Sequence, residues 1–252
     1  MSISYFGAGS NPADNGSQNE GAPGSPAACS IVPPASMTVG QLVRILAYTD
    51  QNHTVVISDA GGQTWNSLSA DGDGTVGGLQ YFWCRFNGTW SANPSVIVTT
   101  AAYGSISAIM AVFTPTSSAN DWGIDVSKTY ATYAGPGTPF DVTITGVTAV
   151  AADTVTLADW TTINESQWAL QTGGWSNPGG ATQWRNTDTN LSISTAYKIQ
   201  TAAGATGNVT NRQTTFTGAT GQKVIMTFKE IASGSDNPLA AVKHPRPGKF
   251  WR

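Results

Sequence analysis

From residue 40 onward, short runs of β-branched and aromatic residues alternate with turns made of Gly, Asn, Asp and Pro. In LQYFWCRF (79–86), Leu79, Tyr81 and Trp83 fall on one side of an extended chain, and Phe82 and Cys84 fall on the other, as strand geometry requires. Six such runs between residues 41 and 113 recur at a spacing of roughly ten residues, without a convincing helical period. The pattern predicts an all-β fold, an antiparallel β-sandwich or a jelly-roll-like arrangement.

The second half of the chain repeats the layout of the first. The stretch GQLVRILAYT, followed by GGQTW, has a counterpart in ADTVTLADWT, followed by GGWSN. This correspondence places Trp65 near Trp175 and Ile109 near Ile225. A shared order of motifs is what a duplication preserves, although alternation and turns alone also make two sandwich halves look alike. We therefore expect two pseudo-repeated halves, which form either one sandwich or two.

Changes in composition divide the chain into five parts. Stretches rich in Pro, Gly, Ser and Asn lie between the β-like regions and predict loops or arms. The expected parts are an N-terminal strand with a Pro/Gly-rich loop or arm (1–39), a first β-sandwich half (40–115), a connector (116–147), a second half (148–232) and an extended basic-aromatic C-terminal arm (233–252).

Charged residues are scarce, at 11% of the 252 residues, against about a quarter in a typical domain. The basic residues upstream of the C-terminal arm are scattered singly, whereas a nucleic-acid binder needs them gathered on one face, so this class is disfavoured. A surface of Thr, Ser, Asn, Gln and Gly suits a protein that packs against copies of itself, because burying charges at an interface is costly. We therefore expect a homo-oligomer.

The sequence also bears on the compartment of the protein. No basic segment followed by an apolar stretch opens the chain, and no uncharged apolar run approaches the ~20 residues that span a bilayer. We expect a protein made in the cytoplasm and not inserted into a membrane. In that setting Cys29 and Cys84 are expected to be reduced thiols.

Few side chains are candidates for catalysis or metal binding. His53 has no Cys or His partner at ligand spacing, so we expect neither a metal site nor a cofactor. Asp71 and Asp73 in SADGDGTVGG resemble the start of a calcium loop that lacks its closing glutamate, and a hairpin turn is the simpler interpretation. Glu165 and Glu230 could meet only through folding, whereas a glycosidase needs two carboxylates about 5 to 10 Å apart. We expect no enzyme and keep a hydrolase as an alternative.

Two tryptophans lie among small polar residues in expected loops, Trp90 in GTWSANP and Trp175 in GGWSNPGG. A tryptophan face is amphipathic and can stack on a sugar ring. Most of the nine tryptophans in the chain must nevertheless fill the core or an interface. Trp90 and Trp175 are therefore candidate glycan-binding residues, with packing as the other interpretation.

The last sixteen residues, NPLAAVKHPRPGKFWR, hold four of the 12 basic residues and no acid. Prolines stiffen such a segment, so that little entropy is lost when it docks, while aromatic anchors and basic groups provide contacts with an acidic neighbour. A solvated end, or an arm that touches nucleic acid, is the alternative. The residues of the expected protein-interaction arm are Lys243, Pro245, Arg246, Pro247, Lys249, Phe250, Trp251 and Arg252.

A series of short motifs runs through residues 3–231: YFGAGS, MTVGQLVRILAYT, GGQTW, LQYFWCRF, GTWSANPSVIVTT, SAIMAVFT and GQKVIMTFKEI. In its order this series resembles β-sandwich structural proteins from the virions of tailed bacteriophages and prophages. Gln41 stands where the family pattern tends to have an aspartate, and AVFTPT replaces an Ala-Tyr-Arg-Gly type of ending.

The resemblance implies a non-enzymatic virion protein that decorates or cements the capsid or belongs to the tail apparatus. Its location would be the virion, and its partners would be other virion proteins, bound through the C-terminal arm. The alternative is a receptor-binding or lectin-like tail protein that contacts host glycans through Trp90 and Trp175.

Overall fold

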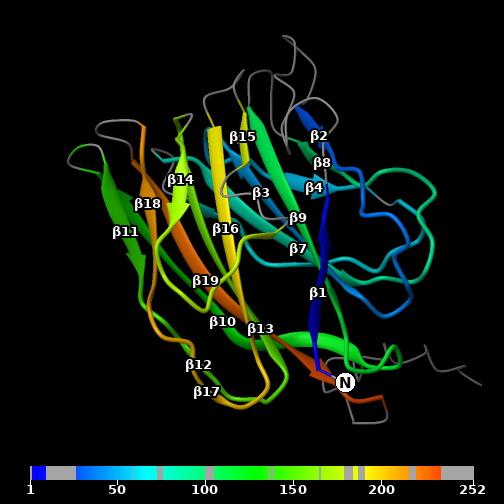
Figure 1. Cartoon of the computed structure of the whole chain (residues 1–252). Helices are drawn as coiled ribbons and strands as arrows, with labels where there is room; N and C mark the ends of the chain where they lie inside the picture. The colour runs from blue at the N-terminus through cyan, green and yellow to red at the C-terminus, as the bar shows by residue number, and fades with distance from the viewer. Residues whose placement is uncertain are drawn as a thin grey trace, which may run out of the picture.

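The computed structural model describes residues 2–9, 27–58, 60–72, 76–99, 105–135, 137, 139–164, 166–178, 184–186, 191–215 and 220–233 (Figure 1). Within these ranges the regular elements are antiparallel β-strands, which confirms the predicted all-β, sandwich-like fold. No helix in the described part of the chain is long and apolar enough to cross a membrane.

The first half forms two sheets. The first inner sheet has the order β1 (Ser4–Ala8), β9 (Ile106–Thr114), β3 (Leu42–Thr49), β7 (Gly78–Arg85) and β5 (Asn66–Ser67), and β6 (Asp71–Gly72) also pairs with β7. The first outer sheet has the order β2 (Ala28–Ser30), β8 (Ser95–Val98) and β4 (Val55–Ile57).

The second half is built in the same way. The second inner sheet has the order β10 (Asp121–Ala134), β19 (Thr220–Ile231), β13 (Thr154–Thr162), β16 (Leu191–Gln200) and β15 (Trp184–Asn186). The second outer sheet has the order β11 (Phe140–Ile144), β18 (Val209–Gln213) and β14 (Trp168–Leu170), and β12 (Thr148–Ala149) forms a short ribbon with β17 (Gly204–Ala205).

The strand orders of the two halves correspond one to one. The inner order β1-β9-β3-β7-β5 has its counterpart in β10-β19-β13-β16-β15, and the outer order β2-β8-β4 in β11-β18-β14. In both halves the chain passes back and forth between its inner and outer sheet, as in a jelly roll. Each half is therefore a sandwich of its own.

The observed strands move the expected boundaries of the parts. β1 and β2 lie within 1–39 but pair with β9 and β8, so they belong to the first sandwich. β10 and β11 lie within 116–147, the expected connector, and are strands of the second sandwich. β10 escaped the sequence analysis because it is an edge strand, with many of its side chains exposed and no strong apolar run.

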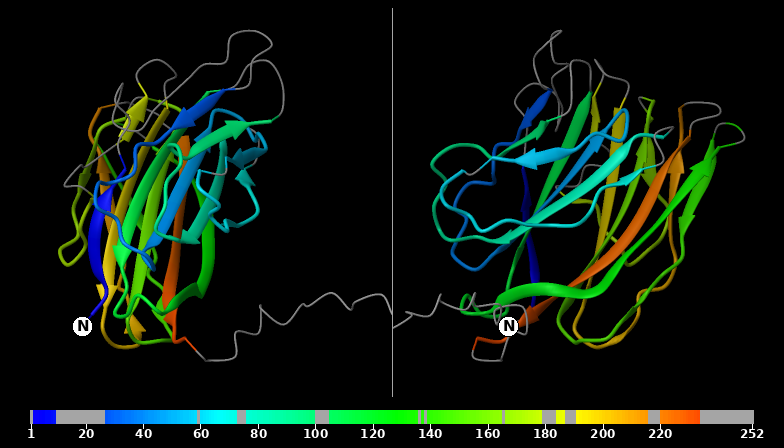
Figure 2. Two further views of the ribbon diagram at one scale, coloured as in Figure 1. Left: turned by 90° about the vertical axis from the view of Figure 1, so that its right-hand side faces the viewer. Right: turned by 180° about the vertical axis from the view of Figure 1, so that it is seen from behind.

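The four sheets stack as outer, inner, inner and outer, with the two inner sheets face to face (Figure 2). Leu46 and Phe113 of the first inner sheet pack against Leu157 and Phe228 of the second in the central core. β3 and β13 are buried on both faces, which explains why their sequences are almost continuously apolar. Across the central core the sheets run in opposite order, since β9 lies opposite β16 and β7 lies near β10.

The pairing that the repeat suggests by eye is one residue out of register in β9 and β19. Ile109 faces the central core, whereas Ile225 faces the core of the second sandwich. The residues of β19 that face the central core are Val224, Met226 and Phe228. A shift of one residue moves a strand side chain to the opposite face, so motif order alone cannot fix such an alignment.

Candidate functional site

A fully buried ion pair joins the two inner sheets at the centre of the molecule. Arg44 on β3 donates from Nη2 to Oδ2 of Asp159 on β13, and both side chains are 0% exposed. The Tyr81 hydroxyl donates to the same oxygen (3.1 Å), and the Thr195 hydroxyl donates to Asp159 Oδ1 (2.6 Å). The guanidinium carbon of Arg44 also lies 4.9 Å from the centre of the Tyr81 ring.

This network serves structure rather than chemistry. Burial raises the pKa of the Asp159 carboxyl, while the Arg44 charge and the bonds from Thr195 and Tyr81 oppose that rise. Burial also raises the pKa of Tyr81 well above its usual value, so its hydroxyl stays protonated and donates. These groups are buried from solvent, so breaking their hydrogen bonds would be costly. Because the bonds join strands of both inner sheets, the network fixes how the two sandwiches align.

Further polar contacts cross the boundary between the halves. Each contact joins a residue of the first half to a residue of the second, so the two sandwiches form one body. Gln222 Nε2 donates to the Gly77 carbonyl (2.8 Å), Trp122 Nε1 donates to the Gly40 carbonyl (2.9 Å), and Lys128 Nζ lies 2.5 Å from the Asp71 carboxylate.

The two candidate glycan-binding tryptophans lie in separate sandwiches. Trp175 is only 7% exposed and packs in the core of the second sandwich, where its ring has no free face for a sugar. Trp90 is half-buried, stacks on Phe86 at 4.9 Å between ring centres and tilts against Trp65 at 6.4 Å. The structure therefore does not bring Trp90 and Trp175 together, and it favours the packing interpretation for both.

The expected docking arm lies outside the described residues. The eight residues assigned to it, Lys243, Pro245, Arg246, Pro247, Lys249, Phe250, Trp251 and Arg252, have no structural description. β19, the last described strand, ends at Ile231 beside Asp121, at the end of the molecule where β1 begins beside Thr114 (Figure 1).

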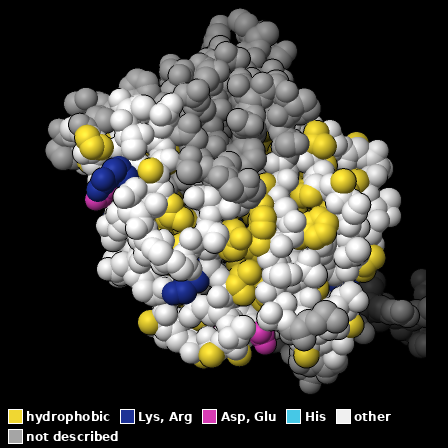
Figure 3. Space-filling model, viewed as in Figure 1, with side chains coloured by type: hydrophobic (Ala, Val, Ile, Leu, Met, Phe, Trp, Pro, Cys, Tyr) yellow, Lys and Arg dark blue, Asp and Glu magenta, His cyan; other side chains and the backbone are white. Residues whose placement is uncertain are grey.

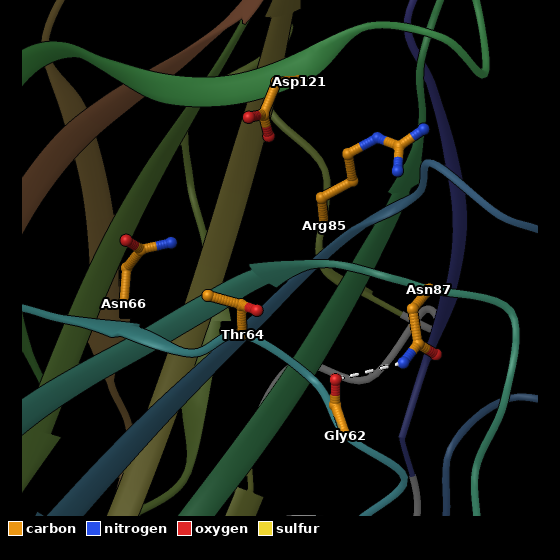
Figure 4. A pocket seen from close by; sticks show the side chains of 6 residues that line it. All are labelled: Gly62, Thr64, Asn66, Arg85, Asn87 and Asp121. Carbon is orange, nitrogen blue, oxygen red and sulfur yellow. Dashed lines mark hydrogen bonds between the residues drawn. The ribbon is translucent and has the colours of Figure 1, made fainter. Parts of the chain in front are cut away.

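A polar pocket of about 400 Å³ opens at the boundary between the halves. Figure 4 shows Thr64 and Asn66 projecting from around β5, Arg85 and Asn87 from the end of β7, and Asp121 from the start of β10. Gly62 completes the lining. This pocket, which we call the seam pocket, thus combines three segments that are far apart in the sequence.

Hydrogen bonds hold the walls of the seam pocket. Arg85 Nε donates to the Asn120 carbonyl (2.8 Å), and Arg85 Nη2 donates to the Ser118 carbonyl. Asn87 Nδ2 donates to the carbonyls of Gly61 (2.8 Å) and Gly62 (3.2 Å). These bonds fix the loops on both sides of the opening.

Most other polar groups of chemical interest have structural roles. Glu230 accepts bonds from Thr116 and Asn120 and so holds the turn between the halves. Asp71 lies in β6, which pairs with β7 as the hairpin interpretation requires, and Asp73 lies outside the described residues. Burial raises the pKa of the Cys84 thiol, which makes it a poor nucleophile. In the described part of the chain, no three His, Cys, Asp or Glu side chains lie close enough to hold a metal ion.

Neither the Arg44–Asp159 pair nor the seam pocket was predicted from the sequence. For the pair a signal existed, because each is a single charge inside an apolar strand. No such signal in the sequence marked the pocket, since Thr64, Asn66 and Asp121 look like ordinary surface residues. No protein-family model, curated protein or solved structure matches this chain.

Proposed function

We propose that this protein is a non-enzymatic structural component of a tailed-bacteriophage virion, which decorates or cements the capsid or forms part of the tail. The starting point is the sequence resemblance to β-sandwich virion proteins over roughly residues 3–231. The observation that carries the proposal is the fusion of two sandwiches through a sealed central core. Among the described residues the central core is closed to solvent, with Leu46, Leu157 and Phe228 all 0% exposed, which suits a building block better than a protein whose domains move against each other.

The outer surface supports this role. On the face in Figure 3, Lys, Arg, Asp and Glu side chains are few and scattered among neutral ones. A neutral polar surface can be buried against neighbours without the desolvation cost of many charges. The proposal therefore includes assembly with further copies and with other virion proteins.

The C-terminal segment is the proposed attachment element. β19 ends at Ile231, at the end of the molecule where β1 begins, as both views in Figure 2 show. Attachment through this segment leaves the opposite end of the body free for other contacts. The basic residues of 237–252 would then meet acidic groups on the partner.

The test is incorporation into particles. A tagged full-length chain is expressed in the bacterial host during phage propagation, and gradient-purified virions are probed for the tag. We expect the full-length protein in the particle fraction and a variant lacking 236–252 in the soluble fraction, with an unchanged far-ultraviolet circular dichroism spectrum. Absence of the full-length protein from particles overturns the proposed function.

A matched control separates attachment chemistry from mere length. Replacing the basic and aromatic residues of 243–252 by serine keeps the number of residues and removes the expected contacts. Loss of incorporation in this variant assigns attachment to those side chains. Retained incorporation shows that the sandwich surface, and not the arm, makes the contact.

The glycan-binding alternative through Trp90 and Trp175 has less support, because Trp175 is buried and the two residues lie in different sandwiches. A glycan array probed with the wild type and with Trp90→Ala would revive this alternative only if binding were lost in the folded variant.

A further inference from the structure

The seam pocket has no part in the attachment role proposed above, yet it has the features of a binding site. Its volume of about 400 Å³ falls within the range of roughly 300–1,000 Å³ that is common for small-molecule sites. It lies where the first sandwich meets the start of β10. Only the folded whole chain can form it.

The lining chemistry selects a class of ligand. Asp121 can only accept hydrogen bonds, Arg85 can only donate them, and Thr64 and Asn66 can do both. The Asn87 side chain is already bonded to neighbouring loop residues, so it forms a wall of the pocket rather than a ligand contact. A simple anion would face the carboxylate of Asp121, and a simple cation would face the guanidinium of Arg85. Neighbouring hydroxyl groups on a neutral ring both donate and accept hydrogen bonds, so they match a lining that contains donors as well as acceptors.

Arg85 and Asp121 are both present but do not neutralise each other. The Arg85 guanidinium donates to the carbonyls of Ser118 and Asn120. The Asp121 carboxylate accepts from the neighbouring Trp122 amide (2.8 Å) through Oδ1. In Figure 4 the Arg85 guanidinium is turned away from the Asp121 carboxylate, and the exposed Asp121 keeps acceptor positions for a ligand.

The wall on the Asn87 side is preorganised. Gln63 Nε2 donates to Asn87 Oδ1 and to the Thr89 carbonyl, both at 2.7 Å. Gly61 has a φ of 123°, and a Cβ atom there would lie 2.5 Å from the Thr89 carbonyl oxygen, so the two loops approach as closely as glycine allows. Fixed polar groups lose little entropy when a ligand binds.

Aromatic side chains pack on the core side of the segment that carries Thr64 and Asn66. Trp65 lies between Thr64 and Asn66 in the sequence, and it packs with Trp90 against the core of the first sandwich. Neighbouring side chains of an extended chain point to opposite faces. The tryptophan therefore anchors the segment that presents Thr64 and Asn66 to the pocket.

We propose that the seam pocket binds a neutral saccharide of one or two rings, held by hydrogen bonds to Thr64, Asn66 and Asp121. This site differs from a stacking site at Trp90 or Trp175, because it depends on polar groups from both halves. The lining residues that the structure describes all lie between Gly62 and Asp121, outside the segment 236–252 assigned to attachment.

The experiment is a nuclear magnetic resonance titration of the ¹⁵N-labelled full chain. The probes are the methyl glycosides of glucose, galactose, mannose and N-acetylglucosamine, the disaccharides maltose and lactose, and inorganic phosphate, each added separately. We expect saturable shifts of the Gly62, Thr64, Asn66 and Asn87 amides with at least one saccharide and none with phosphate. Absence of saturable shifts with every saccharide, or shifts with phosphate alone, overturns the proposal.

Near-isosteric variants locate the site. Thr64→Val and Asp121→Asn are each expected to weaken saccharide binding at least tenfold while the rest of the spectrum stays unchanged. Asp141→Asn, an exposed carboxylate on β11 of the second sandwich, is the matched control and should bind as the wild type does. Equal binding by all three variants places the saccharide elsewhere and contradicts the proposal. Thr64→Val and Asp121→Asn should still enter particles, so this test and the attachment test can fail separately.

Discussion

The boundary between the sandwiches holds an arginine of the first and an aspartate of the second at two places, and the two are bonded to each other at only one of them. At the centre, Arg44 and Asp159 are 0% exposed and bonded to each other. At the rim, Arg85 donates to backbone carbonyls, and Asp121 is exposed in the seam pocket. Burial makes pairing obligatory at the centre, because an unpaired charge there is very costly. At the rim, backbone carbonyls satisfy the Arg85 guanidinium and water solvates Asp121, so the Asp121 carboxylate remains available for a ligand.

The largest expected effect comes from breaking the central pair. Arg44→Met leaves the Asp159 carboxylate buried without its cation, and loss of one partner of a buried pair costs about 3–5 kcal/mol. Urea unfolding followed by tryptophan fluorescence measures the loss. The double variant Arg44→Met with Asp159→Leu removes both charges and should recover most of the stability. If Arg44→Met alone unfolds at the wild-type urea concentration, the pair does not hold the halves together.

A smaller loss is expected when the pair remains but a supporting bond is removed. Thr195→Val keeps the shape of the side chain and removes the 2.6 Å bond to Asp159 Oδ1. A hydrogen bond to a charged group contributes about 1.5–3 kcal/mol. The same urea experiment applies, with Thr132→Val, an exposed position on β10, as the control that should change stability by less than about 0.5 kcal/mol. Equal stability of both variants would show that Asp159 does not need this donor.

A substitution at a glycine can strain the loop that lines the seam pocket without changing any charged residue. Gly61→Ala forces a side chain into a backbone conformation with φ at 123° and against the Thr89 carbonyl, with an expected cost of about 1–3 kcal/mol. Thermal unfolding monitored by circular dichroism should show a lower midpoint, and the Asn87 amide resonance should shift. Gly173→Ala, where a Cβ atom would meet nothing within 4 Å, is the control. An unchanged midpoint for Gly61→Ala would mean that the loop relaxes freely.

The smallest effect is expected at an exposed pair, which completes the comparison of buried and open charges. Arg212 donates to Asp141 on the surface of the second outer sheet and lowers the pKa of that carboxyl. A lowered folded-state pKa means that the stabilisation exists above the ordinary aspartate pKa of about 3.9 and disappears as the pH falls through the lowered value.

Arg212→Gln should therefore reduce stability slightly at neutral pH, and the difference from wild type should shrink in acid and in about 1 M salt. Urea unfolding at a series of pH values measures it. A difference that grows on acidification would contradict the assigned direction.

Much of the fold could be predicted from the sequence, because alternation in runs such as LQYFWCRF is a local property of the strand. The extent of each sandwich could not be predicted so well. β10 lacks a strong apolar run because it is an edge strand, and β2 is only three residues long. Their assignment depends on the partner strands, β19 and β8, which composition does not reveal.

The candidate site was predictable to a lesser degree. Trp175 was a plausible glycan contact in a loop of small residues, but its environment is a core whose other members come from distant strands. Arg44 and Asp159 are 115 residues apart, and only the packing of the inner sheets brings them together. The residues of the seam pocket are joined by topology alone, so no local motif marks them.

The burial of the first inner sheet on both faces has a consequence for synthesis. While the ribosome is still making the second half, the face of β3 and β9 that belongs to the central core has no cover. At about 5–20 residues per second, this state lasts for several seconds, during which an exposed apolar sheet face invites aggregation. Arg44 lies in the middle of that face, and its charge can be solvated there until β13 arrives. Inward-pointing charges protect exposed sheet edges from association, and we expect a charge on this open face to act in the same way. The residue that joins the finished halves is thus also expected to keep the nascent first half soluble.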